Sequence, residues 1–274
     1  MMRLPKTSGQ FYPPEKEEIE FFINSCKTKL NVTKNHLLAG IVPHAGYPFS
    51  GKTANTVFQK LFETQDVDTF VILGPNHSGL DTDGVSDQDW QMPNGIVKAD
   101  HEIIQMIKGN IPVDNASHEN EHSIEVQLPF IKYYFPYAKI VPITINNLDN
   151  LKKYTETLSP LCKEKNIFFL ASSDFTHYGR SFGYMPFVEN VKENVRKIDY
   201  QAIEYIKGKN PEGFLDFINQ NKATICGALP IILLLNILKS VHYDVELLSY
   251  STSADITGDT SHMVSYAGII FQEK

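Results

Sequence analysis

The chain has 274 residues and a formal net charge of -7; 42% of it is hydrophobic and 21% is charged. These values suit a globular protein with a sizeable core and exclude the basic surface that nucleic acid requires. The N-terminus lacks the apolar stretch of a signal peptide, and the most apolar run, 228–238, is too short to span a bilayer. Three widely spaced cysteines indicate a reducing compartment. We therefore expect one cytoplasmic domain over residues 1–274, with no nucleic-acid or membrane partner.

Helical apolar spacing alternates along the chain with short apolar runs that are typical of buried strands. Helices are predicted from Pro14 onward, at 52–62, 101–107, 123–134, 150–165, 187–207 and 211–219, and in a buried helix that runs through 238. Strands are predicted at 37–42, 68–73, 140–145, 167–171, 245–251 and 264–271. The segment 80–94 shows no clear pattern. The alternation predicts a three-layer α/β/α sandwich with a mixed central sheet.

Three of the predicted strands run directly into loops that carry a histidine. The first is followed by P-H-A-G-Y with His44, the second by G-P-N-H with His77, and the strand before residue 172 by S-S-D-F-T-H with Asp174 and His177. Ligands of open α/β sheets bind beyond the carboxyl ends of the strands. If these strands are parallel neighbours, the three histidines lie at one edge of the sheet.

Each of these residues has an ordinary interpretation as well as a chemical one. His44 or His77 alone would be a loop histidine bonded to backbone, but together they favour metal ligation, the common role of imidazole. Cys226, just before a predicted helix, is either a small buried residue or a thiolate ligand whose pKa the helix N-terminus lowers. Asp174 and His177 are an acid/base pair, a pair of ligands, or a turn held by aspartate.

Residues 118–122 spell H-E-N-E-H, which matches the H-E-x-x-H pattern of zinc proteases. That pattern needs both histidines on one helix. Here a turn precedes the motif and the apolar helical face starts only at Ile124, so a zinc protease is not expected. We instead expect Glu121, His122 and Glu125 to enter the central site from a helix start, where they support the ligands or contact substrate.

These motifs, in this order and over nearly the whole chain, resemble the MEMO family, whose bacterial and archaeal members are also called AmmeMemoRadiSam system protein B. The motifs are P-H-A-G-Y (43–47), L-G-P-N-H (73–77), E-H-S-I-E-V-Q-L-P-F (121–130), S-S-D-F-T-H-Y-G (172–179) and I-C-G (225–227). MEMO proteins are similar in fold to the class III extradiol (LigB-type) non-haem iron dioxygenases. The resemblance therefore implies a LigB-like fold.

The resemblance also implies a ligand set. His44, His77 and Cys226 would hold a metal, with the cysteine standing where the dioxygenases have a glutamate. His177 would match the acid/base histidine of the dioxygenases, and Asp174 would lie beside it and orient it.

Aromatic residues near these motifs are expected to line the pocket. Phe11 and Phe49 fall where the human family member has a Trp and a Tyr, and Tyr47 closes the first motif. The pocket would take a small molecule or a peptide. The family also suggests radical-SAM and AMMECR1-type companion proteins as partners.

The leading hypothesis is a mononuclear metal protein with redox chemistry on an unknown substrate. Two histidines and one anionic ligand with vacant positions follow the pattern of non-haem Fe(II) oxygenases, so Fe(II) is the expected metal, with copper or zinc as alternatives. A zinc-dependent hydrolase with His177 as general base is a second hypothesis. A non-catalytic module that binds a peptide or partner in the same pocket is a third.

Overall fold

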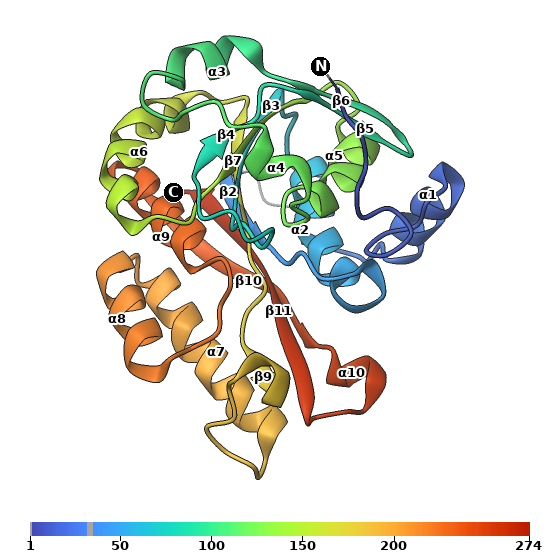
Figure 1. The fold of residues 1–274 in the computed structure, drawn as a ribbon, viewed down its shortest axis with the longest axis vertical. Helices are drawn as coiled ribbons and strands as arrows, with labels where there is room; N and C mark the ends of the chain where they lie inside the picture. Colours follow the sequence, from blue (N-terminus) through green and yellow to red (C-terminus); the bar gives the residue numbers. More distant parts are fainter. Residues whose placement is uncertain (1, 32–34) are drawn as a thin grey trace.

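The centre of the molecule is a mixed β-sheet (Figure 1). The computed structural model describes residues 2–31 and 35–274, and within these ranges eleven strands join in one sheet. The strand order is β1-β5-β6-β7-β3-β8-β2-β11-β10, with β4 on β7 and β9 on β11. The strands are β1 (Met2–Arg3), β2 (Leu37–Val42), β3 (Thr69–Gly74), β4 (Gly84–Val85), β5 (Asp89–Met92), β6 (Gly95–Ala99), β7 (Lys139–Thr144), β8 (Ile167–Ser172), β9 (His177–Gly179), β10 (Tyr243–Thr252) and β11 (His262–Glu273).

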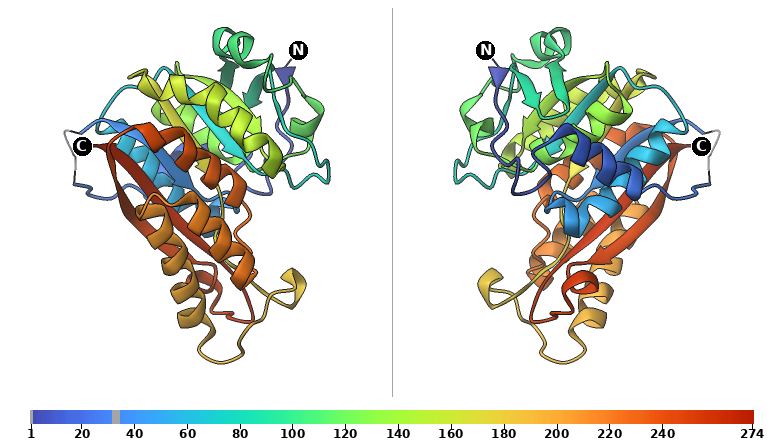
Figure 2. Two further views of the ribbon diagram at one scale, coloured as in Figure 1. Left: turned by 90° about the vertical axis from the view of Figure 1, so that its left-hand side faces the viewer. Right: turned by 90° about the vertical axis from the view of Figure 1, so that its right-hand side faces the viewer.

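Helices cover both faces of this sheet, so the predicted three-layer α/β/α sandwich is confirmed. Helices α3, α6, α8 and α9 pack with part of α7 on one face, and α1, α2 and α5 pack on the other (Figures 1 and 2). The helices are α1 (Lys16–Ser25), α2 (Lys52–Phe62), α3 (His101–Ile107), α4 (Ala116–Glu119), α5 (Leu128–Tyr134), α6 (Leu151–Leu158), α7 (Val191–Lys207), α8 (Pro211–Asn221), α9 (Ala228–Ile237) and α10 (Ala254–Thr257). No helix in the described ranges is both long enough and apolar enough to cross a membrane.

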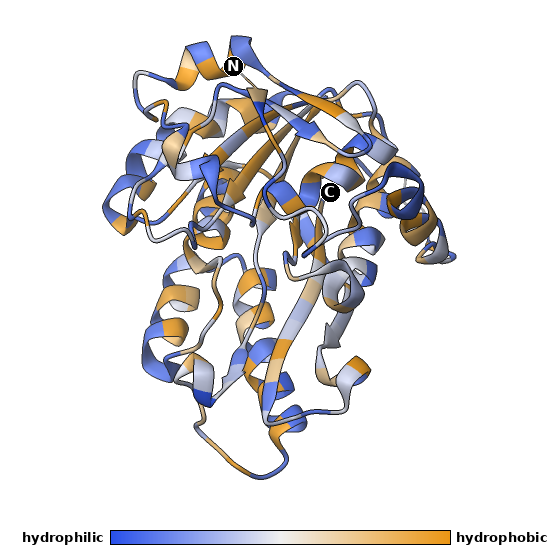
Figure 3. Cartoon of the chain, turned by 45° about the vertical axis from the view of Figure 1, so that its right-hand side comes forward, coloured by the Kyte–Doolittle hydropathy of each residue, from blue (hydrophilic) through white to orange (hydrophobic). Residues whose placement is uncertain are grey.

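The inner strands are buried on both faces, which explains why their sequences are continuously apolar. Along β8, Phe168 and Leu170 pack into the layer of α1, α2 and α5, whereas Phe169 and Ala171 pack into the layer of α9. Alternate side chains of a strand point to opposite faces, so a central parallel strand needs apolar residues at every position. The result is the hydrophobic centre seen in Figure 3.

The three strands that precede the histidine loops are adjacent and parallel, as predicted. Strand β8 pairs in parallel with β2 on one side and with β3 on the other. Val42 stands opposite Ser172, and Leu73 stands opposite Ala171, so the strands end at nearly the same level. The loops that carry His44, His77 and His177 therefore leave one edge of the sheet. Strand β11, antiparallel to both β2 and β10, makes the sheet mixed.

Two predicted helices are shorter than expected, and a proline ends only the first of them. The helix expected at 150–165 ends at Leu158 and continues as a 3-10 turn, Ser159–Lys163, since Pro160 has no amide for the helical hydrogen bond. The segment 123–134 begins with a 3-10 turn, Glu125–Gln127, before α5. Pro129 then lies in the first turn of α5, where a missing amide is tolerated.

Two further regions differ from the expected pattern. The helix expected at 187–207 starts only at Val191, because Asn190 has a left-handed backbone with φ of 49°. The segment 80–94, for which no pattern was clear, forms β4 and β5. Its tryptophan, Trp90, is fully buried on β5.

Candidate metal site

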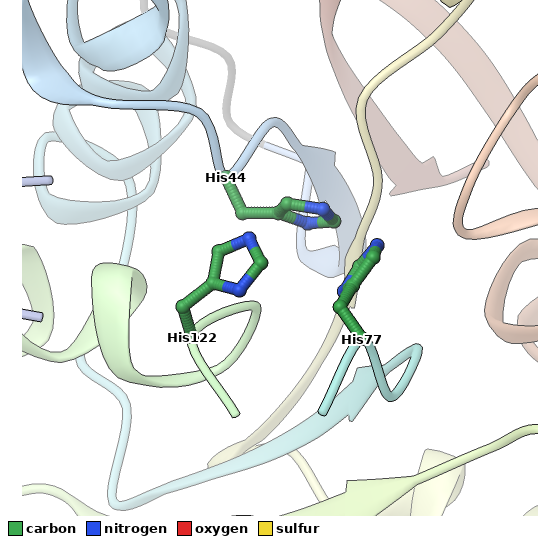
Figure 4. A group of neighbouring side chains, drawn as sticks. All are labelled: His44, His77 and His122. Carbon is green, nitrogen blue, oxygen red and sulfur yellow. The ribbon is translucent and has the colours of Figure 1, made fainter. Parts of the chain in front are cut away.

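Three histidine rings meet at the carboxyl edge of the sheet. His44 follows β2, His77 follows β3, and His122 lies between α4 and α5. Their candidate ligand atoms all lie within 4.8 Å of one another. The ring centroids are 5.1 Å apart for His44 and His77 and 4.9 Å apart for His77 and His122, and Figure 4 shows the rings around a common space.

The tautomer of His44 is set by a chain of hydrogen bonds. Its Nδ1 lies 3.0 Å from the Oγ of Ser172. That hydroxyl donates its own proton to the carbonyl of Ser123 at 2.6 Å and accepts from the Nε2 of Gln127 at 3.0 Å. Because the serine proton is already used, His44 must donate from Nδ1, which leaves the lone pair on Nε2. Burial, reinforced by the neighbouring histidines, lowers the pKa of His44 far below its usual value and keeps the ring neutral.

Glu121 sets the tautomer of His77, as Ser172 does for His44. The Nδ1 of His77 lies 3.2 Å from Oε1 of Glu121, and the backbone amide of His77 donates to Oε2. The same Oε1 accepts the amides of His122 at 2.9 Å and Ser123 at 2.7 Å. Burial raises the pKa of Glu121, but the bond from His77 and these other contacts outweigh it and lower the pKa to about 2. Glu121 is thus a carboxylate that fixes Nδ1–H on His77 and leaves Nε2 free.

His122 is held less firmly than the other two rings. Its Nδ1 lies 3.5 Å from Oε1 of Glu121, which is longer than a good hydrogen bond. Burial is the main cause that lowers the pKa of His122 to about 4. We expected His122 to support the ligands or touch substrate, and the structure places it within the group itself. It follows no strand, so its position next to Glu121 is the only sequence signal of this placement.

Cys226 lies beside His44, just before α9. Its Sγ is 3.2 Å from Nε2 of His44 and 3.6 Å from the carbonyl oxygen of Asp174. Of the two interpretations of Cys226, the small buried residue and the thiolate with a lowered pKa, the metal-free structure favours the first. Burial, together with the charge of Asp174, raises the pKa of Cys226 well above its usual value. The thiol therefore keeps its proton in the metal-free protein, and a metal would have to displace that proton to bind sulfur.

His177 and Asp174 lie on the same loop but have different partners. The Nδ1 of His177 lies 2.9 Å from the carbonyls of both Phe175 and Thr224, so it carries the proton and Nε2 is the acceptor. These carbonyls, rather than Asp174, hold the ring. Oδ1 of Asp174 instead accepts the amide of His44 at 2.8 Å and thereby anchors the His44 loop. Burial raises the pKa of Asp174.

The three expected pocket aromatics occupy different surroundings. Phe11 lies against the ring of His122, with centroids 4.5 Å apart. Tyr47 is buried in the core, stacked on Phe130 at 4.6 Å, with its hydroxyl on the carbonyl of Val126. Phe49 is 39% exposed and lines a hollow of about 290 Å³ formed largely by the start of β11 and the residues on either side of α10.

The H-E-x-x-H pattern does not form a zinc-protease site, as predicted. Helix α4 ends at Glu119, so the two histidines are not carried by one helix. His118 is fully buried and its Nε2 bonds to the carbonyl of Gly84 at 3.0 Å. Only His122 faces the other histidines.

Comparison with known proteins shows the family to which the ordered motifs belong. The sequence model of a family described as Memo-like protein matches residues 3–270. The chain belongs to the Memo family. MEMO1 family proteins of Methanosarcina barkeri (strain Fusaro / DSM 804) and Thermococcus kodakarensis (strain ATCC BAA-918 / JCM 12380 / KOD1) are 35% and 34% identical to it. Each match covers 99% of this chain and 100% of the relative.

A similar protein from Methanosarcina mazei, also described as a MEMO1 family protein, is 36% identical over 99% of both chains. The predicted family of this Memo protein is therefore confirmed. A solved structure of an uncharacterized protein from Escherichia coli K12 covers 86% of this chain and 99% of its own, with 13% identity and a TM-score of 0.44. That likeness is too low to support a conclusion.

Proposed function

We propose that this Memo family protein holds a single metal ion between His44, His77 and Cys226 and acts as a metal-dependent oxidoreductase. The observation that supports the proposal best is the convergence of three imidazoles whose ligand atoms lie within 4.8 Å of one another. His44 and His77 belong to this group and also to the ligand set expected from the resemblance. Cys226 supplies the anionic ligand, 3.2 Å from His44.

The hydrogen bonds favour His44 and His77 as ligands over His122. Histidines that bind metal usually donate their second N–H to a neighbouring acceptor, which fixes the tautomer. Ser172 accepts this bond from His44 and Glu121 accepts it from His77. Nitrogens bound to one zinc ion at about 2.1 Å would lie no more than about 4.2 Å apart, so small side-chain movements would complete the site.

Two histidines and one anionic ligand suit Fe(II), which would supply one-electron and oxygen chemistry with open coordination positions. The chain's own groups then have separate tasks. Nε2 of His177 accepts or donates a proton, since its Nδ1–H is held by two carbonyls. The ring of His122 lies beside both histidine ligands, with centroids 5.4 Å from His44 and 4.9 Å from His77. The side chain of His77 is 35% exposed, which leaves a face through which a small molecule or peptide can enter.

A zinc-dependent hydrolase is the second candidate, and one observation favours it. Three histidines with a fourth position open to water form a known catalytic zinc arrangement. His44, His77 and His122 form such a group. In this case His177 would act as general base on the attacking water.

Metal content separates these functions. Protein purified anaerobically without a His-tag would be analysed by mass spectrometry, with His44→Ala and Cys226→Ser as test variants and His242→Ala, an exposed histidine, as the matched control. Near-stoichiometric iron or copper that is lost in both test variants supports the oxidoreductase. Zinc instead supports the hydrolase.

A protein that binds none of these metals, even after reconstitution, would contradict both enzymes. It would leave a binding role for the same pocket, for a peptide or for the radical-SAM and AMMECR1-type companion proteins.

A further inference from the structure

The N-terminal segment (residues 2–12) is bonded to the site loop (residues 118–125), which carries Glu121 and His122. The side chain of Arg3 is 3% exposed and lies between the two segments. Its Nε donates to the carbonyl of His118 at 2.7 Å, and one terminal nitrogen donates to the carbonyl of Glu121 at 2.9 Å. Its other terminal nitrogen lies 2.6 Å from the carboxylate of Glu125. One guanidinium therefore holds three points of the site loop.

Glu125 binds the rest of the N-terminal segment from the opposite side. Its carboxylate is fully buried, and Oε1 accepts the amide and the hydroxyl of Thr7, each at 2.9 Å. The same oxygen accepts the amide of Lys6 at 2.9 Å and the hydroxyl of Tyr12 at 2.7 Å. A carboxylate can only accept, and this one meets donors from both ends of the segment.

The N-terminal segment contacts the histidine group through Phe11. The ring of Phe11 lies against the ring of His122, and its carbonyl accepts the amide of Tyr47 at 2.6 Å. Fixing the segment therefore places an aromatic wall on one of the three imidazoles. It also fixes the backbone of Glu121, the residue that orients His77.

We propose that Arg3 and Glu125 are positioning residues of the metal site: they hold the N-terminal segment on the site loop and so set the geometry of His77 and His122. The inference rests on the proposed metal site. Neither residue hydrogen-bonds to an imidazole of the histidine group: Arg3 bonds to the backbone of His118 and Glu121, and Glu125 bonds to Arg3 and the N-terminal segment. They act through Glu121 and Phe11. Loss of either partner leaves the other as a buried unpaired charge, so the loop would rearrange to reach water.

Docking of the N-terminal segment and binding of the metal should affect each other equally. If docking of the segment strengthens metal binding, metal binding must strengthen docking by the same factor. Trp90 offers a direct signal for docking, because it is the only tryptophan of the chain and the guanidinium of Arg3 lies 3.9 Å from the centre of its ring. Tryptophan fluorescence therefore reports the position of the N-terminal segment without any assay of activity.

The test compares wild type with Glu125→Gln, Arg3→Met and the double variant. Co²⁺ serves as the probe metal, with affinity measured by chelator competition and docking by Trp90 fluorescence. Leu61→Ala is the matched control, since Leu61 is fully buried at the far end of α2 and its loss lowers the melting temperature without touching the site. Circular dichroism confirms that each variant is folded.

We expect each single variant to bind Co²⁺ roughly 10- to 100-fold more weakly, as for partners that orient metal ligands elsewhere. The double variant should lose little more than either single one, because both act through one contact. Zn²⁺, which does not quench tryptophan, should restore the emission of Trp90 in Glu125→Gln, the variant that keeps the guanidinium. Leu61→Ala should bind Co²⁺ like wild type.

Wild-type affinity in Glu125→Gln and Arg3→Met would overturn the positioning role while leaving the metal site intact. An equal loss in Leu61→Ala would also overturn it, because general destabilisation would then explain the effect. If wild type itself binds no Co²⁺, Zn²⁺, Fe²⁺ or copper, the proposed function fails, and this inference fails with it.

Discussion

Nε2 of His44 lies 3.2 Å from Sγ of Cys226, although 182 positions separate the two residues in the chain. His44 follows β2, and Cys226 precedes α9. Ser172 and Ser123 force the proton of His44 onto Nδ1, so Nε2 presents a lone pair to the sulfur. In the metal-free protein the thiol can donate to this lone pair. A metal between them would replace that proton and bind both atoms.

The closeness of His44 and Cys226 leads to a spectroscopic test of whether Cys226 binds the metal. With Co²⁺ bound, a thiolate ligand gives a sulfur-to-metal absorption band. We expect Cys226→Ser to lose this band and to bind Co²⁺ at least about tenfold more weakly, because it loses a ligand rather than an orienting partner. His122→Phe should retain the band. If His122→Phe abolishes binding and Cys226→Ser does not, the metal is held by the three histidines and the assignment of Cys226 is wrong.

Ser172 should matter for metal binding even though it cannot reach the metal. Ser172→Ala removes the acceptor for Nδ1 of His44 and leaves the carbonyl of Ser123 without its donor. We expect a roughly 10- to 100-fold loss of Co²⁺ affinity and a destabilisation of about 1–3 kcal/mol from the unsatisfied buried groups. Chelator competition and urea unfolding measure the two effects.

Thr69→Val is the control for this substitution, since it removes a buried hydroxyl that bonds to Asp100 at the opposite end of β3. Thr69→Val should lose stability but keep the Co²⁺ affinity of wild type. Equal metal affinity in wild type and Ser172→Ala would show that the serine does not set the tautomer of His44.

The strands and the shared edge of the site were predictable because both depend on local sequence. Central parallel strands are apolar at every position, so β2, β3 and β8 could be located from short apolar runs in the sequence. Loops that follow such strands leave one edge of the sheet, as those of His44, His77 and His177 do, although only His44 and His77 of these belong to the histidine group. The helix ends were less predictable where a proline or a left-handed residue, such as Pro160 or Asn190, decides the boundary.

The rest of the site depends on contacts between distant segments, which no local pattern reveals. His122 reaches the group only because the site loop folds against the loop after β3, where Glu121 binds His77. The pKa of Cys226 rises because burial and the charge of Asp174 outweigh the hydrogen bonds that lower it, and burial follows from the whole fold. Arg3 and Glu125 are 122 positions apart and form a buried ion pair.

Acid should weaken the protein through His118. Burial, aided by the charge of Arg3, lowers the pKa of this histidine from 6.5 to about 4 in the folded state. As the pH falls below 6.5 the unfolded chain takes up the proton first, so stability is complete above that pH and is lost on the way down to about 4. At 1.36 kcal/mol per pKa unit, the loss is on the order of 3 kcal/mol.

Urea unfolding of the metal-free protein at about pH 7.5 and about pH 4.5 tests this, since these values bracket most of the titration. His118→Gln keeps a donor for the carbonyl of Gly84 but cannot titrate. The difference in stability between the two pH values should therefore be smaller in the variant. An equal pH dependence in both proteins would show that His118 is not the group responsible.

Gly227 is the position where a single methyl group should disturb the cysteine side of the site. A Cβ at Gly227 would lie 2.6 Å from the carbonyl oxygen of Ser172 and would also collide with the Cβ of Ser173. Backbone beside Cys226 would have to move, and with it the sulfur. We expect Gly227→Ala to cost about 1–3 kcal/mol, as overpacking usually does, and to weaken the thiolate band of the Co²⁺ protein.

Gly109→Ala is the control, because a Cβ there meets no atom within 4 Å. That variant should stay within about 0.5 kcal/mol of wild type. A Gly227→Ala protein with normal stability and an unchanged band would mean that the Cys226 loop is free to shift, and that the close packing on Ser172 and Ser173 does not position the sulfur.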